Sequence, residues 1–400
     1  MESWKLLKLP GRDVAGLGQN LTTGEDVTLT SHEDESALAY NVFALSALTG
    51  GPGIPIYHWH GKHTNKYILI IDLRGPSLEE VFEKNGREFK APTLVYLAEQ
   101  LVARLQYIHG RSITVGKLTP YSCSVGSQQW RSPQLLIDCF SPPAGAQTFA
   151  QDLNSLGELL LYFCNGFVTW EQFQVARKNS HPFTPYGTLS VFVCELLSQN
   201  PPDYPRLKLM IEHMYNSLDV PERFLPFYNN ERFISARIDS TGVLFAHLEK
   251  HLAKIGCEVK GNQSCLCEMV PSSLGLILDL YYELFIRLRP RHWKGLYLVR
   301  AHHLPNRLWR DLRWFITATK NESTMKQKSF ADMIYSFLTV LFETVPHYRI
   351  YWTEYLLSQA HRQREFEIDL NRRQAWVSTI RHWEMELHRL EAMPPEWLVV

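Results

Sequence analysis

The sequence predicts an α+β fold in which a short strand-rich region precedes a much longer helical region. Residues 24–30 (GEDVTLT) alternate after a turn, and residues 66–73 (KYILIIDL) form an apolar run, so both segments predict strands. Between them, residues 35–48 (ESALAYNVFALSAL) have helical periodicity and end at a stretch rich in Gly and Pro. From residue 77 to residue 218 helical periodicity dominates.

The composition is typical of a globular protein. The length of 400 residues predicts two or three domains, because it is large for a single hydrophobic core. Basic and acidic residues number 41 each, so a charged partner would need a local patch. Apolar runs such as residues 67–71 are far too short to span a bilayer, and the N-terminal residues lack the apolar core of a signal peptide. Seven scattered cysteines fit a reducing compartment. We therefore expect an intracellular protein, in nucleus or cytoplasm, with no membrane partner.

A second helical region begins after residues 219–221 (DVP). Residues 347–393 contain neither Gly nor Pro, which predicts a terminal helix of roughly forty residues. Its later part places apolar side chains at alternating four- and three-residue spacings, as in a coiled-coil seam. These are Trp376, Ile380, Trp383, Leu387 and Leu390. The stripe either packs on its own domain or binds another chain. Trp397, in the apolar tail, docks either within the chain or in a partner groove.

Six segments of the first 218 residues agree in order and approximate spacing with one known family. They are LGQNLTTGEDV (17–27), GGPGIPIYHWHG (50–61), GPSLEEVF (75–82), LAEQLVARLQYIH (97–109), QDLNSLGELLLYF (151–163) and NPPDYPRLKLMIEHMY (200–215). These segments resemble the casein kinase 1 family of protein kinases. Over about residues 5–218 the resemblance implies a bilobal kinase-like fold, with a β-rich N-lobe at 1–73 and a helical C-lobe at 74–218. Residues 219–400 remain as a separate, mostly helical domain.

The residues that a kinase needs for chemistry are replaced at almost every aligned position. The glycine-rich turn falls at residues 8–13 (KLPGRD), where Pro10 replaces a flexible glycine. The other aligned positions hold Thr30 for the phosphate-binding lysine, Asn41 for its glutamate, Lys117 for the catalytic base, Ser122 for the asparagine and Asp138 for the metal-binding aspartate. Asp138 alone keeps its residue type, and one carboxylate with weak support is a poor magnesium site.

A shortened segment agrees with these losses. Only about a dozen residues separate Asp138 from Asp152, where kinases of this family have several times as many. The missing segment orders the site and forms the platform for a peptide substrate. Asp152 itself matches the aspartate that braces the catalytic loop. The resemblance therefore implies a pseudokinase that is not an enzyme, needs no cofactor and no catalytic metal, and serves as a scaffold or protein-interaction subunit of a larger complex.

A group of histidines and cysteines in the C-terminal region raises the question of zinc. His247 and His251 share a helix face, and Cys257, Cys265 and Cys267 follow within about twenty residues. The spacing matches no zinc finger, and the alternative is ordinary helix histidines with small buried thiols.

A basic and aromatic segment at residues 287–313 is a candidate binding surface. It contains Arg287, Arg289, Arg291, Trp293, Lys294, Arg300, Arg307 and Arg310. Such a segment binds phosphate by charge and stacking, so nucleic acid is the alternative partner to an acidic or phosphorylated protein. A third interpretation is that these arginines pair with acids further along the chain, such as Glu365, Glu367 and Asp369.

Overall fold

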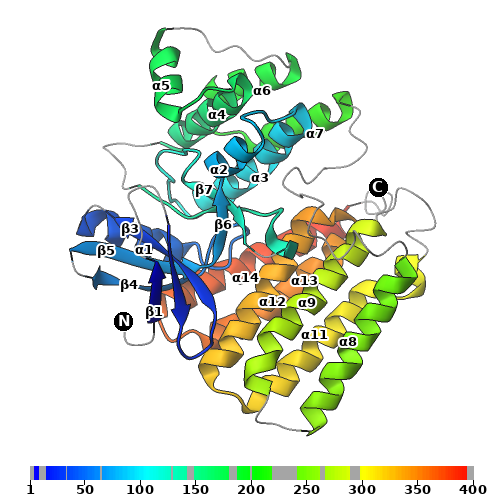
Figure 1. The fold of residues 1–400 in the computed structure, drawn as a ribbon. Helices are drawn as coiled ribbons and strands as arrows, with labels where there is room; N and C mark the ends of the chain where they lie inside the picture. Colours follow the sequence, from blue (N-terminus) through cyan, green and yellow to red (C-terminus); the bar gives the residue numbers. More distant parts are fainter. Residues whose placement is uncertain are drawn as a thin grey trace. The chain divides into compact units, whose positions relative to one another are not determined.

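The computed structural model describes residues 4–8, 15–32, 34–63, 65–127, 129–141, 148–179, 187–198, 201–218, 241–261, 266–288 and 298–393. The contacts divide the chain into two compact units. The first consists of Met1–Ser127 and Ser132–Tyr228, and the second of Gln128–Arg131 and Asn229–Val400. The expected α+β class is confirmed, because a five-stranded sheet near the N-terminus precedes a chain that is mostly helical (Figure 1). The expected boundary at residue 219 lies outside the described residues.

The first unit begins with a five-stranded antiparallel sheet of order β1-β2-β3-β5-β4. Its strands are β1 (Trp4–Lys8), β2 (Gly16–Asn20), β3 (Asp26–His32), β4 (Tyr57–His63) and β5 (Lys66–Asp72). Four consecutive residues of β5, from Ile68 to Ile71, are fully buried, which explains why that strand has an uninterrupted apolar run.

Helix α1 (Glu35–Ala47) lies in the chain between β3 and β4. It begins at Asp34, whose side chain accepts a hydrogen bond from the backbone N–H of Ala37 and so satisfies one free donor of the first turn. The helix contacts β3, β4 and β5, and its buried residues join the main core of the unit.

A small three-stranded sheet borders the loop that contains Lys117 and Ser122. Its strands are β6 (Arg74–Ser77), β7 (Cys123–Gly126) and β8 (Leu135–Ile137), in that order. This loop, residues 110–122, runs from α3 (Ala91–His109) to β7. Because α3 is almost entirely buried, both ends of this loop are attached to rigid elements.

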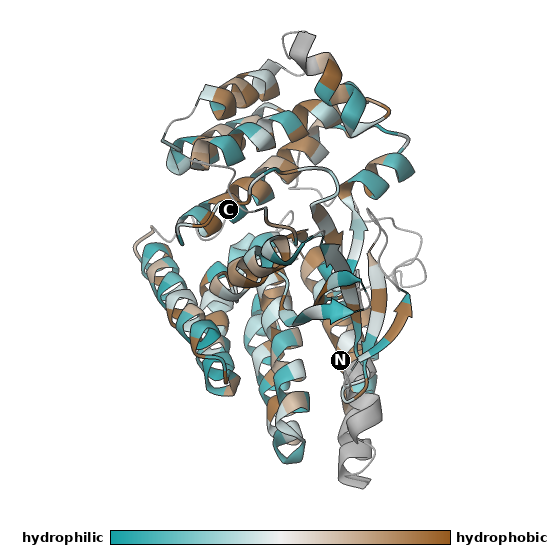
Figure 2. Ribbon diagram, turned by 90° about the vertical axis from the view of Figure 1, so that its left-hand side faces the viewer, coloured by the Kyte–Doolittle hydropathy of each residue, from teal (hydrophilic) through white to brown (hydrophobic). Residues whose placement is uncertain are grey.

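The remaining helices of the first unit are α2 (Leu78–Lys84), α4 (Phe149–Asn165), α5 (Trp170–Asn179), α6 (Gly187–Ser198) and α7 (Tyr204–Ser217). Helix α3 packs against α4 and α7, and α4 packs against α6. Residues at helical spacing on α3 and α4, including Leu101, Leu105, Leu156 and Leu160, have no exposed surface. Figure 2 shows the resulting alternation of apolar and polar residues along the helices.

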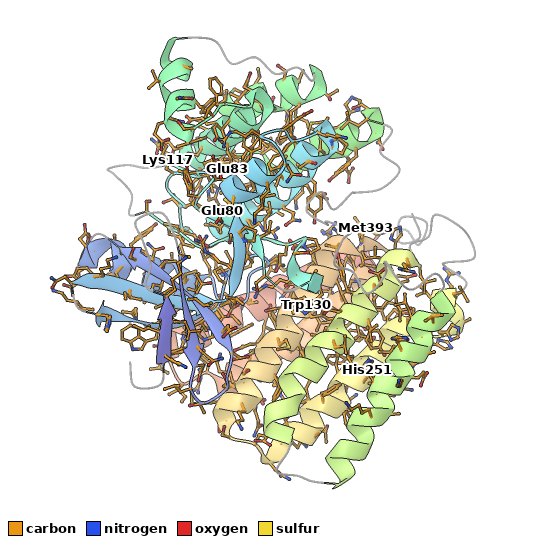
Figure 3. The ribbon with its side chains drawn as sticks, viewed as in Figure 1. Glu80, Glu83, Lys117, Trp130, His251 and Met393 are labelled. Carbon is orange, nitrogen blue, oxygen red and sulfur yellow. The ribbon has the colours of Figure 1, made fainter. Side chains whose placement is uncertain are left out.

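The second unit is helical in the residues that the structure describes. Its main helices are α8 (Thr241–Gly261), α9 (Leu266–Arg287), α11 (Leu304–Ala318), α12 (Thr324–Thr344), α13 (Arg349–Phe366) and α14 (Leu370–Glu391). It also contains the short 3₁₀ turn η1 (Gln129–Arg131), which the chain reaches between β7 and β8. In this turn Trp130, labelled in Figure 3, is buried, packs edge-to-face on Phe337 of α12 and donates its backbone N–H to Asp279 of α9.

The prediction of one unbroken terminal helix is wrong. The stretch without Gly or Pro is divided into α13 and α14, because Glu367 at the end of α13 has an extended backbone. Asp369 then caps a new helix by accepting a hydrogen bond from the N–H of Arg372 at 2.9 Å. The cap at Asp369 stabilises the start of this second helix.

None of the helices in the described parts of the chain combines the length and the apolar character that crossing a membrane requires.

Candidate functional site

Thr30, aligned with the phosphate-binding lysine, lies on the third strand and has a local partner. It stands opposite Leu69 of β5, and its hydroxyl lies 3.3 Å from Nε2 of His32 on the same strand. A threonine side chain is short and uncharged, so it cannot supply the positive charge that holds a nucleotide's phosphates.

Asn41, aligned with the glutamate partner of that lysine, forms two hydrogen bonds with the backbone of one distant residue, Phe140. Its Nδ2 donates to the carbonyl of Phe140 at 2.6 Å, and its Oδ1 accepts from the N–H of Phe140 at 2.8 Å. The side chain is buried. An amide can make both bonds because it carries a donor and an acceptor, whereas an ionised glutamate carries acceptors alone. Asn41 therefore fixes α1 on the segment after β8.

Asp138, aligned with the metal-binding aspartate, is buried in an ion pair. Its Oδ2 lies 2.8 Å from Nη1 of Arg74, and the hydroxyl of Ser124 donates to the same oxygen at 3.3 Å. Burial raises the pKa of the Asp138 carboxyl, while Arg74 and Ser124 act in the opposite direction. The side chain is 3% exposed, so the charge of this carboxylate is compensated from within the protein.

Asp152 of α4 holds the backbone of the loop between α3 and β7. Asp152 is fully buried and accepts hydrogen bonds from the N–H groups of Val115 at 2.7 Å and Gly116 at 3.1 Å. His109 Nε2 lies 2.9 Å from the same carboxylate. Gly116 has a positive φ of 96°, and a Cβ there would lie 2.8 Å from the Cβ of Ser141, so a larger residue would be strained.

The two remaining aligned residues, Lys117 and Ser122, contact other residues of the first unit. Lys117, aligned with the catalytic base and labelled in Figure 3, is exposed, and its Nζ lies 6.0 Å from the ring centre of Trp170. Ser122, aligned with the second metal ligand, bonds within its own turn, since its hydroxyl donates to the carbonyl of Thr119 and accepts from the N–H of Thr119. Among the described residues, each of the five aligned side chains therefore contacts a different partner. Two of the positions are joined through the backbone, because the N–H of Asp138 donates to the carbonyl of Ser122 at 3.5 Å.

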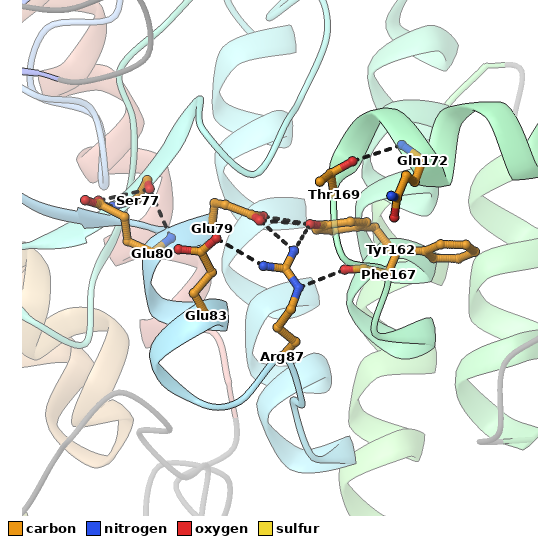
Figure 4. Close-up of polar contacts among 9 residues, drawn as sticks. All are labelled: Ser77, Glu79, Glu80, Glu83, Arg87, Tyr162, Phe167, Thr169 and Gln172. Atoms are coloured by element: carbon orange, nitrogen blue, oxygen red, sulfur yellow. Dashed lines mark hydrogen bonds and ion pairs between the residues drawn. The ribbon is translucent and has the colours of Figure 1, made fainter.

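A network of hydrogen bonds that the sequence does not predict joins α2 to α4 (Figure 4). Glu79 accepts hydrogen bonds from Arg87 at 2.7 Å and from the hydroxyl of Tyr162 at 2.9 Å. Arg87 Nε also donates to the carbonyl of Phe167. Burial, and next the neighbouring Glu79, raise the pKa of Tyr162, so this hydroxyl stays a donor. The sequence offered a local signal, the capping box of Ser77 and Glu80 at the start of α2, but nothing in it marked the burial of Glu79.

The zinc candidates are brought together only in part. His247 and His251 both lie on α8, as the spacing predicted. Cys257 and Cys267 fall within α8 and α9, where their side chains are not described, and Cys265 lies outside the described residues. Within the described parts of the chain, no group of three or more His, Cys, Asp or Glu side chains is placed to hold a metal ion.

Three arginines of the basic segment 287–313 form ion pairs, but not with the acids expected at Glu365, Glu367 and Asp369. Arg289, Arg291, Trp293 and Lys294 lie outside the described residues. Arg287 pairs with Glu283 in its own helix, Arg307 pairs with Glu249 of α8, and Arg310 lies 3.3 Å from Asp311. Glu367, the partner expected for such arginines, pairs with Arg372 of α14 instead. Arg300 is exposed.

The apolar stripe of α14 packs inside its own unit. Of the two alternatives, packing on its own domain is the one that the structure shows, and the stripe is not a surface for another chain. Trp376, Ile380, Trp383 and Leu390 are buried, and Leu387 is half-buried. Trp383 donates from its indole N–H to the hydroxyl of Tyr335 on α12 at 2.8 Å. Burying these large rings within the unit removes more apolar surface from water than an exposed seam would. Trp397 lies outside the described residues.

A scan against protein-family models finds none that matches this chain.

Proposed function

We propose that this chain is a casein kinase 1-like pseudokinase with a helical C-terminal region, and that it works as a non-catalytic scaffold in a protein complex. The positions of the aligned residues support the proposal. Thr30 lies on the third strand, Asn41 on the helix that follows it, and Lys117 in the loop after α3. Asp138 directly follows β8. These are the places that a kinase-like chain requires for its lysine, glutamate, base and metal-binding aspartate.

The observation that carries the loss of chemistry is the ion pair between Arg74 and Asp138. Magnesium bound with a nucleotide needs a carboxylate oxygen that can approach the ion at about 2.1 Å. Here the carboxylate is buried, and one of its oxygens faces a guanidinium group at 2.8 Å. A divalent cation at this place would be repelled by Arg74, and Arg74 would have to leave a buried site.

The scaffold role is supported by what the same residues do instead. Asn41 ties α1 to Phe140, and Asp152 holds the backbone of the loop at Val115 and Gly116. These contacts keep the shape of the unit without any group that needs a substrate. A rigid surface of this kind is suited to holding partner proteins in a fixed arrangement.

The test of the lost activity uses the purified full-length protein with ATP and magnesium. We expect neither a thermal shift with the nucleotide nor phosphate transfer to casein, while an active casein kinase 1 in the same buffer gives both. Phosphate transfer that Asp138→Asn abolishes would contradict the proposal.

The scaffold role is tested separately by purifying the protein from cells with its bound partners. We expect stoichiometric partners to be retained by the variant Lys117→Ala, because this exposed position supplies no chemistry. Loss of those partners from a folded variant would instead point to a working site, and a chain that is purified alone would contradict the scaffold role.

A second candidate function is nucleic-acid binding, and one observation favours it. On α11 the side chains of Arg310, Arg313 and Trp314 are exposed at helical spacing on one face. Arginine and tryptophan together bind the phosphates and stack on the bases of a single strand. The test is a salt-sensitive gel shift with single-stranded RNA or DNA. Loss of that shift in Arg310→Glu with Arg313→Glu, but not in Arg373→Glu with Arg381→Glu on α14, would favour this candidate.

A further inference from the structure

Three segments of the first unit each contribute two adjacent residues to one set of hydrogen bonds. The pairs are Tyr40 and Asn41 on α1, Thr114 and Val115 in the loop between α3 and β7, and Phe140 and Ser141 after β8. The hydroxyl of Tyr40 donates to the carbonyl of Thr114 at 3.1 Å. The N–H of Ser141 donates to the carbonyl of Val115 at 3.0 Å. The two bonds between Asn41 and Phe140 complete the set. We call these six residues the three-segment ring.

The three-segment ring is closed, because each segment is hydrogen bonded to both of the others. Successive Cα atoms of a chain are held about 3.8 Å apart, so the two residues that a segment contributes move together. A segment that separated widely from one neighbour would therefore also pull on its bond to the other neighbour. The contacts of the ring consequently depend on one another, as contacts within one network do.

Half of the three-segment ring is protected from water. Asn41, Val115 and Phe140 are each 1% exposed, whereas Tyr40 and Thr114 are half-buried and Ser141 is exposed. If the segments separated only a little, the buried polar groups would lose their partners before water could reach them. Leaving such groups unpaired carries the full cost of their desolvation. Partial opening is therefore disfavoured relative to both the closed ring and a fully opened one.

Two of the three segments are also attached to other parts of the first unit. Asp152 of α4 accepts hydrogen bonds from the N–H groups of Val115 and Gly116, which holds the loop. The N–H of Ile137 on β8 donates to the carbonyl of Gly53 at 3.0 Å, which holds the strand just before Phe140. Because the loop and β8 are held in this way, the ring fixes the middle of α1 against them.

We propose that the three-segment ring is a conformational lock. In this lock α1, the loop and the segment after β8 separate only together, so α1 keeps a single position in the first unit. A ligand that required α1 to move would have to bind the opened form tightly enough to offset the loss of all four bonds. The proposal goes beyond the scaffold role, because it concerns motion within the first unit and does not depend on which partner is bound.

Hydrogen exchange of the full-length protein, measured by mass spectrometry, tests the lock. The variant is Tyr40→Phe, which removes one hydroxyl and keeps the aromatic ring. Loss of one hydrogen bond of this kind should raise the population of the opened form about threefold to tenfold. We expect the exchange rate to rise by that factor in peptides covering residues 113–116. An equal rise is expected in peptides covering residues 138–141, although the hydroxyl of Tyr40 bonds to Thr114.

The matched control is Tyr215→Phe, which removes a hydroxyl that donates to Glu99 at 2.9 Å elsewhere in the same unit. This variant should leave the exchange of both segments unchanged. A rise confined to residues 113–116 in Tyr40→Phe would show that the segments move separately. An equal rise in α6, which packs on α4 and α7, would show that they open only when the whole unit unfolds. Either result, or no change in any segment, would overturn the lock.

Discussion

The side-chain amide of Asn41 forms two hydrogen bonds with the backbone N–H and C=O of Phe140, which lies 99 positions further along the chain. One bond is 2.6 Å long and the other 2.8 Å. This pair joins α1 to the segment that follows β8, so the helix is positioned by a neutral contact rather than by an ion pair. An asparagine suits this place because its amide carries both the donor and the acceptor that the two bonds require.

Replacing Asn41 should therefore destabilise the first unit. In Asn41→Ala both polar groups of Phe140 lose their partner inside the core, which should lower the free energy of unfolding by about 2–4 kcal/mol. Chemical unfolding measures the change. Asn85→Ala, which removes an exposed asparagine from the end of α2, is the control and should cost less than about 1 kcal/mol. Equal effects in the two variants would contradict the role given to Asn41.

The ion pair between Arg74 and Asp138 should behave as a coupled pair. Arg74→Met or Asp138→Leu alone leaves one buried charge without its partner, and each change should cost about 3–5 kcal/mol. The double variant should cost clearly less than the sum, because neither charge remains. A cycle of unfolding measurements on the four proteins tests this. Simple additivity of the two changes would show that the pair does not matter for stability.

Stability of the second unit should depend on pH through Asp279. Burial raises the pKa of this carboxyl from its ordinary value to about 7, although the N–H of Trp130 bonds to it. Because the folded state then holds a proton that the unfolded state releases, stability is greatest near pH 4 and falls as the pH rises to about 7. The slope is at most about 1.4 kcal/mol per pH unit.

The measurement for Asp279 compares unfolding at pH 5 and pH 8 in the wild type and in Asp279→Asn. The amide can still accept the hydrogen bond from Trp130 but does not titrate, so the variant should lose this part of the decline. A decline of the same size in both proteins would assign the pH dependence to other groups.

Two glycines with similar backbone angles should differ greatly in tolerance. Gly53 has a φ of 71°, and a Cβ there would lie 2.3 Å from Nε of Arg104 and 2.4 Å from the carbonyl oxygen of Leu135. Gly24 has a φ of 75° with nothing within 4 Å of such a Cβ. Gly24→Ala should cost only the backbone strain of about 1 kcal/mol. Gly53→Ala should cost about 3 kcal/mol or more, because the buried arginine must also move. Thermal unfolding distinguishes the two, and similar melting temperatures would refute the close approach.

Local features of the fold were readable from the sequence because they depend on neighbouring residues. The apolar run at 66–73 predicted β5, and the periodicity of residues 35–48 with the glycines after it predicted α1. The predicted length of the terminal helix differs from the structure, where the stretch is divided into α13 and α14. The sequence did not show this division, because the cap at Asp369 is a single polar side chain within an otherwise continuous helical pattern.

Contacts between distant residues were decided by the tertiary structure alone. The sequence does not predict that Asp138 and Arg74 form an ion pair at 2.8 Å. It also does not predict the hydrogen bond between Asn41 and Phe140. It marks the stripe at Trp376 and Trp383 as apolar without saying which surface covers it, and packing on α12 settles that question. Periodicity records which face of an element is apolar. The partner of that face, or of a buried charge, depends on how the chain folds back on itself, and this requires the assembled core.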